Sequence, residues 1–416
     1  MNISMGISFV LFSFLFFLFI IFIISLFKKQ KFSKLKSFAN VSVLIPTFNE
    51  EKNIVNCLNS VLNSNYNKKN LEIIVVDDES KDDTVNVVEK FIEKNKDYDI
   101  KLIKAKHQGK SGCLNLGVKH AKNEFILTID ADVVILKDTI KKLVTPLVEK
   151  NVGATNSVAY IRKPKKFIEY FQMIEFCLNN LIRTSFSKVF KNSIWFFGAV
   201  ACYKKSILKE VGYFKKDTLT EDMDICLEIF NKKYKIVTVE DCFISTLACP
   251  SVLLLFKQRM RWYFGALQSL FKNKRLLKGK KRSAPVIFLF VNQYWWTFFS
   301  FVFFPMTIYQ VYFWIPSYEI LEFSFYIFRW FSLLGPFYVF YMMPEWGFNF
   351  LNIFGVMSGV LTFIMGLFAL IKFKGVFRFK TFFGLFFYFP YTIILAAIIV
   401  SGVIKYTFSK KKYFIN

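Results

Sequence analysis

Apolar residues fall into separate blocks along this chain, and their distribution limits the folds that it can adopt. Residues 5–27 carry no charged side chain, and a run of this length can cross a bilayer core of about 30 Å. Residues 37–284 have the mixed composition of a water-soluble domain. Further apolar stretches predict membrane spans near 286–306, 323–343, 350–371 and 383–404. The sequence therefore predicts a soluble domain between membrane-spanning segments.

A cleaved signal peptide is the competing interpretation of residues 5–27. No basic residue precedes this run, and it is longer than the apolar core of a usual signal peptide. The basic segment KKQKFSKLK follows at 28–36, and basic residues mark the cytoplasmic side of a span. We therefore expect a multi-pass protein of the plasma membrane with its soluble domain in the cytoplasm.

The membrane topology near the C-terminus has two solutions. Four later spans would place the basic residues 372–380 outside while the lysines at 410–412 stay inside. Either one apolar segment is re-entrant, or residues 372–380 lie flat on the cytoplasmic surface.

The net charge of +26 raises the question of a nucleic-acid partner. Much of the excess lies beside apolar segments, at 28–36, 272–282 and 372–380. Lysine clusters in such positions contact anionic lipid head groups. We therefore expect membrane lipid, and not nucleic acid, to contact these clusters.

Within the soluble part, runs rich in β-branched and apolar residues alternate with helical patterns. The runs are 41–45, 71–76, 101–105 and 124–129, and polar residues follow each of them. Alternating strands and helices predict an α/β fold with a parallel sheet. Ligands of such sheets bind at the carboxyl ends of the strands. The polar residues that follow these strands are therefore expected to converge on one crevice.

The segment LTIDADVVI at 127–135 places Asp130 and Asp132 two residues apart at the end of a predicted strand. Residues with this spacing point to the same side of an extended segment. Two carboxylates so close repel each other unless a cation lies between them, and Mg²⁺ or Mn²⁺ suits such oxygen ligands. A polar turn is the alternative for this stretch alone, but the convergence of strand ends favours a metal site.

Other phosphate-binding motifs are absent from the sequence. No GxGxxG follows the first predicted strand, and no GxxxxGK[ST] occurs. The acidic strand ends suit a nucleotide held through its base, its ribose and a metal-bridged pyrophosphate. With only two histidines in the chain, His107 and His120, a His-based metal cluster and a Ser-His-Asp triad are also disfavoured.

Six short motifs occur in a fixed order between about residues 40 and 270. They are IPTFNEE (45–51), VVDDES (75–80), HQGKSGCLNLG (107–117), DAD (130–132), TED (220–222) and QRMRW (258–262). Together they resemble the membrane-embedded family 2 glycosyltransferases that build polysaccharides, such as poly-N-acetylglucosamine, chitin, hyaluronan and cellulose synthases. Within this family, the stretch from TED to QRMRW is most similar to the bacterial poly-β-1,6-N-acetylglucosamine synthases.

The resemblance implies a cytoplasmic α/β domain of the GT-A type, with a parallel-rich sheet, combined with transmembrane helices. The expected divisions are a span with a basic linker (1–36), the catalytic domain (37–250), an interfacial helix with a basic linker (251–284) and C-terminal spans (285–416). A second interfacial helix is expected near 165–190.

The resemblance also implies residues that bind a UDP-sugar donor. Thr47, Phe48 and Glu50 would border the uracil. Asp78, with Asp77, would contact the base. The remaining donor contacts would come from Lys110, Asn115, Asp130, Gln258 and Arg261. Asp132, with Asp130, would hold Mg²⁺ or Mn²⁺.

The TED motif at 220–222 has two interpretations. Thr220 followed by acidic residues is a common start of a helix. The resemblance instead places the catalytic base at Asp222, with Glu221 beside it, and a carboxylate can take the proton from an attacking sugar hydroxyl. The acceptor would contact Gly198 and Ala199, and its terminal sugar would stack on Trp262.

These features favour an inverting, processive glycosyltransferase. It would polymerise a sugar, N-acetylglucosamine in the closest resemblance, from a UDP-sugar at the cytoplasmic face and export the growing chain through its own helices. The alternative is transfer of one sugar to a polyprenyl phosphate or another lipid. A non-catalytic membrane subunit is disfavoured, because DAD, TED and QRMRW are all intact.

Overall fold

A computed structural model of the 416-residue chain describes residues 3–32, 37–193, 196–278, 284–314 and 319–408. The predicted basic residues at 33–36, 279–282 and 410–412 lie outside these described residues. The described part contains one eight-stranded sheet. Its strands are β1 Val41–Thr47, β2 Leu71–Asp77, β3 Asp99–Lys104, β4 Phe125–Ile129, β5 Val134–Ile135, β6 Val152–Ile161, β7 Val200–Lys204 and β8 Lys235–Thr246.

The sheet is mixed, with the strand order β3-β2-β1-β4-β7-β6-β8-β5. The first four strands of this order are parallel, with Val41 of β1 paired to Leu71 of β2 and to Phe125 of β4. These are the four strands that the sequence predicts, so the α/β fold is confirmed. Strand β7 runs antiparallel to β4 and to β6, which makes the second half of the sheet mixed.

Helices surround this sheet and extend away from it. In the sheet domain they are α2 Ile54–Leu62, α3 Thr84–Lys94, α4 Gly109–His120, α5 Thr139–Leu147, α6 Phe167–Phe190, α7 Lys205–Glu210, α8 Glu221–Asn231 and α9 Val252–Lys272, with short 3₁₀ turns at Lys68–Asn70 and Lys274–Leu277. Outside it are α1 Ile3–Leu26, α10 Ala284–Trp314, α11 Ile320–Trp330, α12 Leu334–Trp346, α13 Phe350–Lys372, α14 Phe379–Phe386 and α15 Tyr388–Phe408.

Two apolar cores lie on opposite faces of the sheet, because successive strand residues point to opposite sides. Val43 of β1 packs in the core that contains α2, α3, α5 and α6. Its neighbour Leu44 packs in the core that contains α4, α7 and α8. Both side chains are fully buried. The sheet is therefore covered on both faces.

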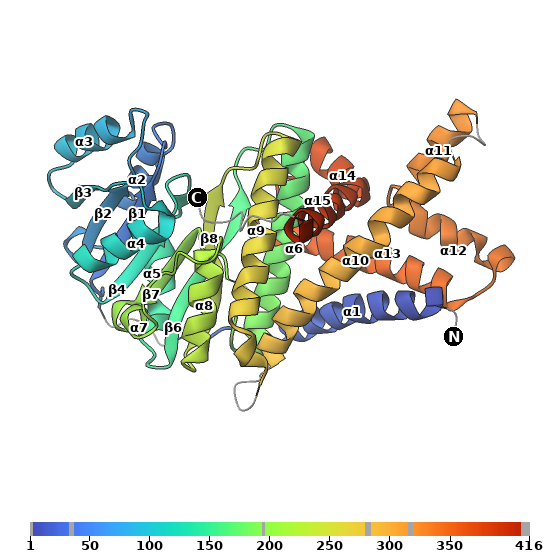
Figure 1. The fold of residues 1–416 in the computed structure, drawn as a ribbon, viewed down its shortest axis with the longest axis horizontal. Helices are drawn as coiled ribbons and strands as arrows, with labels where there is room; N and C mark the ends of the chain where they lie inside the picture. The colour runs from blue at the N-terminus through green and yellow to red at the C-terminus, as the bar shows by residue number, and fades with distance from the viewer. Residues whose placement is uncertain (1–2, 33–36, 194–195, 279–283, 315–318, 409–416) are drawn as a thin grey trace.

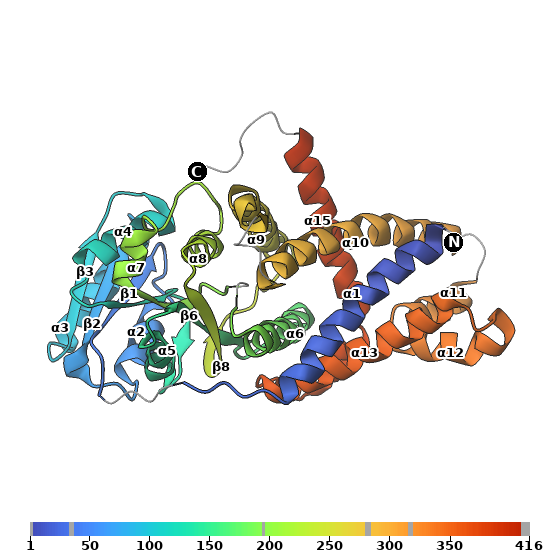
Figure 2. The same ribbon diagram turned by 90° about the horizontal axis from the view of Figure 1, so that it is seen from below.

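The molecule is elongated, with the sheet domain at one end (Figure 1). Helices α1, α10 and α13 run along the long axis away from the sheet, and α1 begins at the remote end. Helices α6 and α9 run across this axis between the two parts, as the two perpendicular views agree (Figure 2). The interfacial helices predicted at 165–190 and 251–271 correspond to α6 and α9. Both lie between the sheet domain and the apolar helices α1, α10 and α13.

Three helices of the described residues are long and apolar enough to cross a membrane, over 284–309, 352–372 and 388–405. The N-terminal span predicted at 5–27 is helix α1, whose described apolar stretch is Phe12–Leu26. Helix α15 differs from α10 and α13 in direction: it is nearly end-on in Figure 1 and extends across the long axis in Figure 2.

Two predicted spans were wrong in their limits. Residues 323–343 form not one helix but two, α11 and α12, which break around Ser332. The hydroxyl of Ser332 accepts a hydrogen bond from the Leu334 N–H, and Pro336 lies in the first turn of α12, where its missing N–H costs nothing. The span predicted at 383–404 is likewise divided, with α14 ending at Phe386 and α15 beginning at Tyr388.

The basic segment 372–380 packs against the sheet domain. Lys372 forms an ion pair with Glu240 of β8 at 2.7 Å, and Lys380 donates to the Lys165 carbonyl at 2.7 Å. Phe373 is fully buried in the core beside α6. The segment therefore lies beside α6 and β8 of the sheet domain.

Candidate active site

A cavity of about 1220 Å³ begins at the carboxyl ends of β1 and β4 and continues between the helices. Its wall near the sheet includes most of the predicted site residues. They are Thr47, Phe48, Glu50, Asp78, Lys110, Asp130, Asp132, Gly198, Ala199, Glu221, Asp222, Gln258, Arg261 and Trp262. Its far wall comes from α1, α10, α13 and α15. The tertiary structure thus brings residues from six separate motifs to one space.

Lys110 connects the DAD and TED motifs. Its Nζ lies 2.6 Å from Oδ1 of Asp130 and 2.9 Å from Oε1 of Glu221. Burial raises the pKa of Asp130 to about 6, although the positive charge of Lys110 opposes this rise. The two carboxylates keep the pKa of Lys110 above its ordinary value despite its burial. Lys110 is therefore charged at neutral pH and neutralises part of the negative site.

Asp222 lies in the first turn of α8 and is held by backbone N–H groups. Gly198 N–H donates to its Oδ2 at 2.9 Å, and Met223 N–H donates to its Oδ1 at 2.8 Å. TED also marks the start of a helix, as the alternative interpretation expects, because α8 begins at Glu221. Thr220 stands at the N-cap position, but its side chain makes no capping hydrogen bond. Thr220, Glu221 and Asp222 all line the cavity.

The environment separates the pKa values of Asp222 and Glu221. Burial raises the pKa of Asp222, and the neighbouring negative charge of Glu221 adds to this rise. Burial acts in the same direction on Glu221, but the contact with Lys110 outweighs it and leaves the pKa of Glu221 below its usual value. Such a divergence is typical of paired carboxylates with different roles. A carboxylate with a raised pKa is the better proton acceptor.

Asp132 fits the donor set of a divalent cation. Its side chain receives one hydrogen bond, from Thr246 at 3.4 Å, and no lysine or arginine among the described residues forms an ion pair with it. Burial raises the pKa of nearby Glu50, and the charge of Asp132 contributes. The described residues contain no cluster of three metal-binding side chains. Magnesium sites, however, often use only one or two carboxylates together with substrate phosphates.

The end of the cavity predicted to bind the base is shaped by Asp78. Its carboxylate accepts hydrogen bonds from the N–H groups of Gln108 at 2.8 Å and Gly109 at 3.0 Å, where α4 begins. His107 also lies 3.0 Å from this carboxylate. The ring of Phe48, which is 44% exposed, lies 5.3 Å from the His107 ring. Asp78 thus fixes the loop before α4, and Phe48 offers an open aromatic face.

Two predicted donor residues lie outside the cavity wall. The carboxylate of Asp77 accepts from the N–H of Ser80 at 3.0 Å and closes the turn after β2. Within that turn Glu79 has a φ of 66°, the left-handed conformation that glycine adopts most easily. Asn115 bonds through both ends of its amide to the backbone of Phe214, at 2.8 and 2.9 Å. In this structure Asp77 and Asn115 support the site and do not face it.

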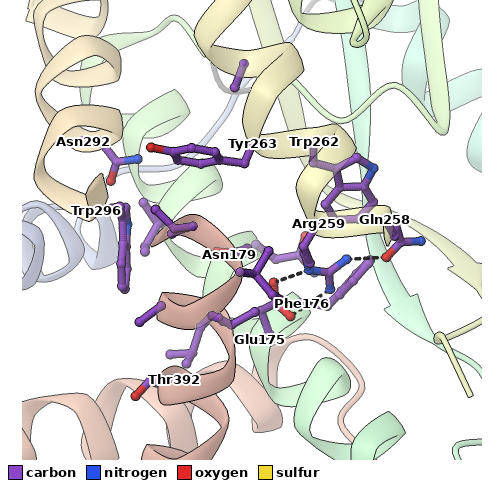
Figure 3. A pocket seen from close by; sticks show the side chains of 18 of the residues that line it. Glu175, Phe176, Asn179, Gln258, Arg259, Trp262, Tyr263, Asn292, Trp296 and Thr392 are labelled. Carbon is purple, nitrogen blue, oxygen red and sulfur yellow. Dashed lines mark hydrogen bonds and ion pairs between the residues drawn. The ribbon is translucent and has the colours of Figure 1, made fainter. Parts of the chain in front are cut away.

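Some cavity residues were not predicted from the sequence. Arg183 of α6 donates to the Ser157 carbonyl at 3.0 Å and lies 5.2 Å from the Phe197 ring; burial lowers its pKa to about 9. Glu175 of α6 and Arg259 of α9 form an ion pair at 2.8 Å in the cavity wall (Figure 3). Arg259 lies within the QRMRW motif, whereas the sequence signal for Arg183 and Glu175 is a charged residue inside an apolar helix pattern, which does not identify the partner.

The chain is similar in sequence to known proteins. Residues 42–212 match the sequence profile described as Glycosyl transferase family 2. The chain is 30% identical over 261 residues to a poly-beta-1,6-N-acetyl-D-glucosamine synthase of Staphylococcus epidermidis, covering 61% of each protein. It is 28% identical over 254 residues to the synthase of the same name from Staphylococcus aureus strain COL, covering 60% of each. The chain therefore spans about three fifths of the length of these relatives.

One solved structure resembles nearly the whole chain. It is a mannosyltransferase from Pyrobaculum calidifontis in complex with GDP-Man and Mn²⁺, with a TM-score of 0.65 over 98% of this chain and 99% of that one. The sequence identity is 19%. The similarity supports the arrangement of sheet domain and helices as one fold.

Proposed function

We propose that this chain, whose residues 42–212 match the Glycosyl transferase family 2 profile, is an inverting, processive glycosyltransferase that polymerises N-acetylglucosamine from a UDP-sugar. The proposal places the sheet domain in the cytoplasm and the growing polysaccharide in a path between the protein's own membrane helices. The choice of sugar comes from the poly-N-acetylglucosamine synthases among the relatives.

The observation that carries the proposal is the continuity of the cavity. It joins Asp222 and Trp262 at the sheet to Asn292 and Trp296 of α10. Asn292 is 3% exposed, and its Oδ1 finds no hydrogen-bond partner among the described residues. A buried, unpaired amide oxygen is costly unless a ligand supplies a donor. A sugar hydroxyl would supply one, and aromatic faces beside it would suit sugar rings.

In the proposed reaction, Asp222 accepts the proton of the acceptor hydroxyl as this oxygen attacks the anomeric carbon of the donor. The bond between that carbon and the UDP oxygen breaks on the opposite face, so the configuration inverts and no covalent enzyme intermediate forms. Gly198 holds the Asp222 carboxylate in place through its N–H. Arg261, an exposed cation on the cavity wall, would stabilise the charge on the leaving UDP.

Asp132, with Asp130, would hold the divalent cation, which would neutralise charge on the donor pyrophosphate. Lys110 would stand between this metal site and Glu221 and would keep the carboxylates from repelling one another. Trp262 would support the terminal sugar while UDP is exchanged for a fresh donor.

A second candidate function is the transfer of one sugar to a lipid. The part of the cavity between the membrane-type helices is lined largely by apolar side chains, among them Phe299, Phe303, Met306, Leu395 and Ile399. Such a wall would also accommodate an isoprenoid or acyl chain. The products of the two reactions differ in kind, since one is a long polymer and the other is a glycolipid.

The test uses the full chain, purified in detergent and reconstituted in liposomes. UDP-GlcNAc, UDP-Glc, UDP-GlcA and GDP-mannose are supplied separately with Mg²⁺ or Mn²⁺, because the mannosyltransferase neighbour holds GDP-Man and Mn²⁺. We expect UDP release and a high-mass polymer from UDP-GlcNAc. A lipid carrying a single sugar would favour the second candidate, and the absence of nucleotide release from every donor would exclude both.

A further inference from the structure

An ion pair spans from α6 to α9 in the wall of the cavity. Nε of Arg259 lies 3.0 Å from Oε1 of Glu175, and Nη2 lies 2.8 Å from Oε2, so the pair is bidentate. The Arg259 and Glu175 side chains are only 8% and 12% exposed. Two parallel hydrogen bonds of this kind fix the plane of the guanidinium as well as its position.

A tyrosine of helix α15 also binds this ion pair. The hydroxyl of Tyr391 donates to Oε2 of Glu175. The Tyr391 ring also stacks on Phe171 of α6, with 5.5 Å between the ring centres. Glu175 therefore binds groups from both α9 and α15, and this network joins three helices at one carboxylate.

The same guanidinium contacts two residues of the QRMRW motif. Its central carbon lies 4.2 Å from the centre of the Trp262 ring, which is a cation–π contact. Its Nη1 donates to Oε1 of Gln258, and both contacts are visible in the close view of the cavity (Figure 3). Arg259 thus lies directly against Trp262, which the proposed function assigns to the acceptor, and Gln258, which the family resemblance assigns to the donor.

Helix packing alone does not require these charges. Removing two charges from water is costly, and apolar side chains of similar volume hold helices together equally well or better. What a bidentate, stacked arginine provides beyond packing is a fixed orientation for the groups that it touches. We propose that Arg259, held by Glu175 and Tyr391, is a positioning residue that sets the orientations of Trp262 and Gln258 for sugar transfer.

This inference relies on the expected roles of Trp262 and Gln258. It adds Glu175 and Tyr391, which lie outside the six motifs, to the residues that affect sugar transfer. It also gives α15 a part in the reaction, because the Tyr391 hydroxyl ends the network. A displacement of α15 would remove the hydrogen bond from Tyr391 to Glu175. Glu175 would then hold Arg259 less firmly, and the orientation of the Trp262 ring, on which the acceptor sugar stacks, would be less well defined.

The test compares Arg259→Lys and Tyr391→Phe with the wild type, with UDP-GlcNAc as the donor. Lysine keeps the charge but loses the planar, bidentate contact, and phenylalanine loses only the hydroxyl. The readout is the amount of sugar incorporated into product per UDP released, together with the affinity for UDP. We expect Arg259→Lys to lower this ratio by about tenfold, because water replaces a poorly placed acceptor, while UDP affinity changes less than about twofold. Tyr391→Phe should change the ratio in the same direction by a smaller factor.

Glu240→Gln is the matched control. Glu240 of β8 pairs with Lys188 of α6 at 3.0 Å and with Lys372 of α13 at 2.7 Å, so it also joins helices through charges. Glu240 is not part of the cavity wall. This variant should lower thermal stability and leave the ratio of incorporated sugar to released UDP unchanged.

The positioning role is overturned if Arg259→Lys lowers stability but keeps the wild-type ratio, or if Glu240→Gln lowers the ratio equally. Failure of the proposed function has a different signature, since the wild type itself would then release no UDP from UDP-GlcNAc or would form only a lipid that carries a single sugar.

Discussion

The backbone N–H of Gly198 donates a hydrogen bond to Oδ2 of Asp222, with 2.9 Å between the two atoms. The two residues are 24 positions apart in sequence, and the fold brings the segment before β7 against the first turn of α8. A Cβ atom on residue 198 would overlap the Asp222 side chain. The glycine is therefore required for the carboxylate to reach its observed position.

Gly198→Ala should displace the Asp222 carboxylate and lower kcat by at least about tenfold, while UDP binds normally. Steady-state UDP release and UDP titration measure the two quantities. Gly355→Ala in α13 is the control, because an added Cβ there meets nothing within 4 Å. Wild-type turnover in Gly198→Ala would contradict the requirement for close approach.

Asp222→Asn should lower turnover by on the order of a hundredfold, because the amide cannot accept the proton, and should leave UDP affinity near the wild-type value. Asp224→Asn is the comparison within the same helix. Asp224 is fully buried and binds Lys272 at 2.7 Å, so this change should destabilise the fold by about 1.5–3 kcal/mol. An equal loss of UDP binding in Asp222→Asn would assign Asp222 a structural role instead.

The pH profile of kcat should report the raised pKa of Asp222. Activity requires the ionised carboxylate, so the rate should fall as the pH decreases through this pKa, at a higher pH than for an ordinary aspartate. The charge of Lys110 lowers the pKa of Asp222, against the stronger effect of burial. Lys110→Met should therefore move the acid limb to higher pH, whereas Lys106→Met at an exposed position should not. An unmoved limb would mean that another group controls the profile.

Removal of the divalent cation should stop the reaction. EDTA should abolish UDP release by the wild type, and added Mg²⁺ or Mn²⁺ should restore it. Asp132→Asn should lose activity that added metal restores poorly, since the amide carries no charge to hold the cation. Full activity in EDTA would exclude a metal role for Asp132.

Trp262→Ala should shorten the product far more than it weakens UDP binding, because the growing chain loses the surface that supports its terminal sugar. Asn292→Leu, deeper in the cavity, should also shorten the product and leave the first transfer unaffected. Product mass from proteoliposomes and UDP titration measure these effects. Polymer of wild-type length from Trp262→Ala would exclude the stacking role.

Local sequence patterns predicted the elements that depend on local physics. The apolar runs at 41–45 and 71–76 became β1 and β2, because β-branched residues with polar turns on either side suit buried parallel strands. Most of the site residues that the motifs predicted also line one cavity. Their proposed roles in donor and acceptor binding still await the experiments above.

Hydropathy was less reliable for the membrane-type helices. It cannot distinguish one long helix from two that break at a capped turn, as at Ser332, because both have the same composition. The motifs also did not predict the direction in which each side chain points. Asn115 lies within a matching motif, yet its amide turns to the Phe214 backbone.

The sequence by itself determined the four parallel strands β1 to β4 and the acidic motifs that follow them, because each depends on neighbours within a few residues. Only the tertiary structure decided that Lys110 pairs with both Asp130 and Glu221, that Gly198 holds Asp222, and that Glu175 joins Arg259 to Tyr391. These contacts join residues from 20 to more than 200 positions apart. The energy of these contacts depends on how deeply the groups are buried and on the direction in which they point. Both are determined by how the chain packs, and a local sequence pattern does not predict either.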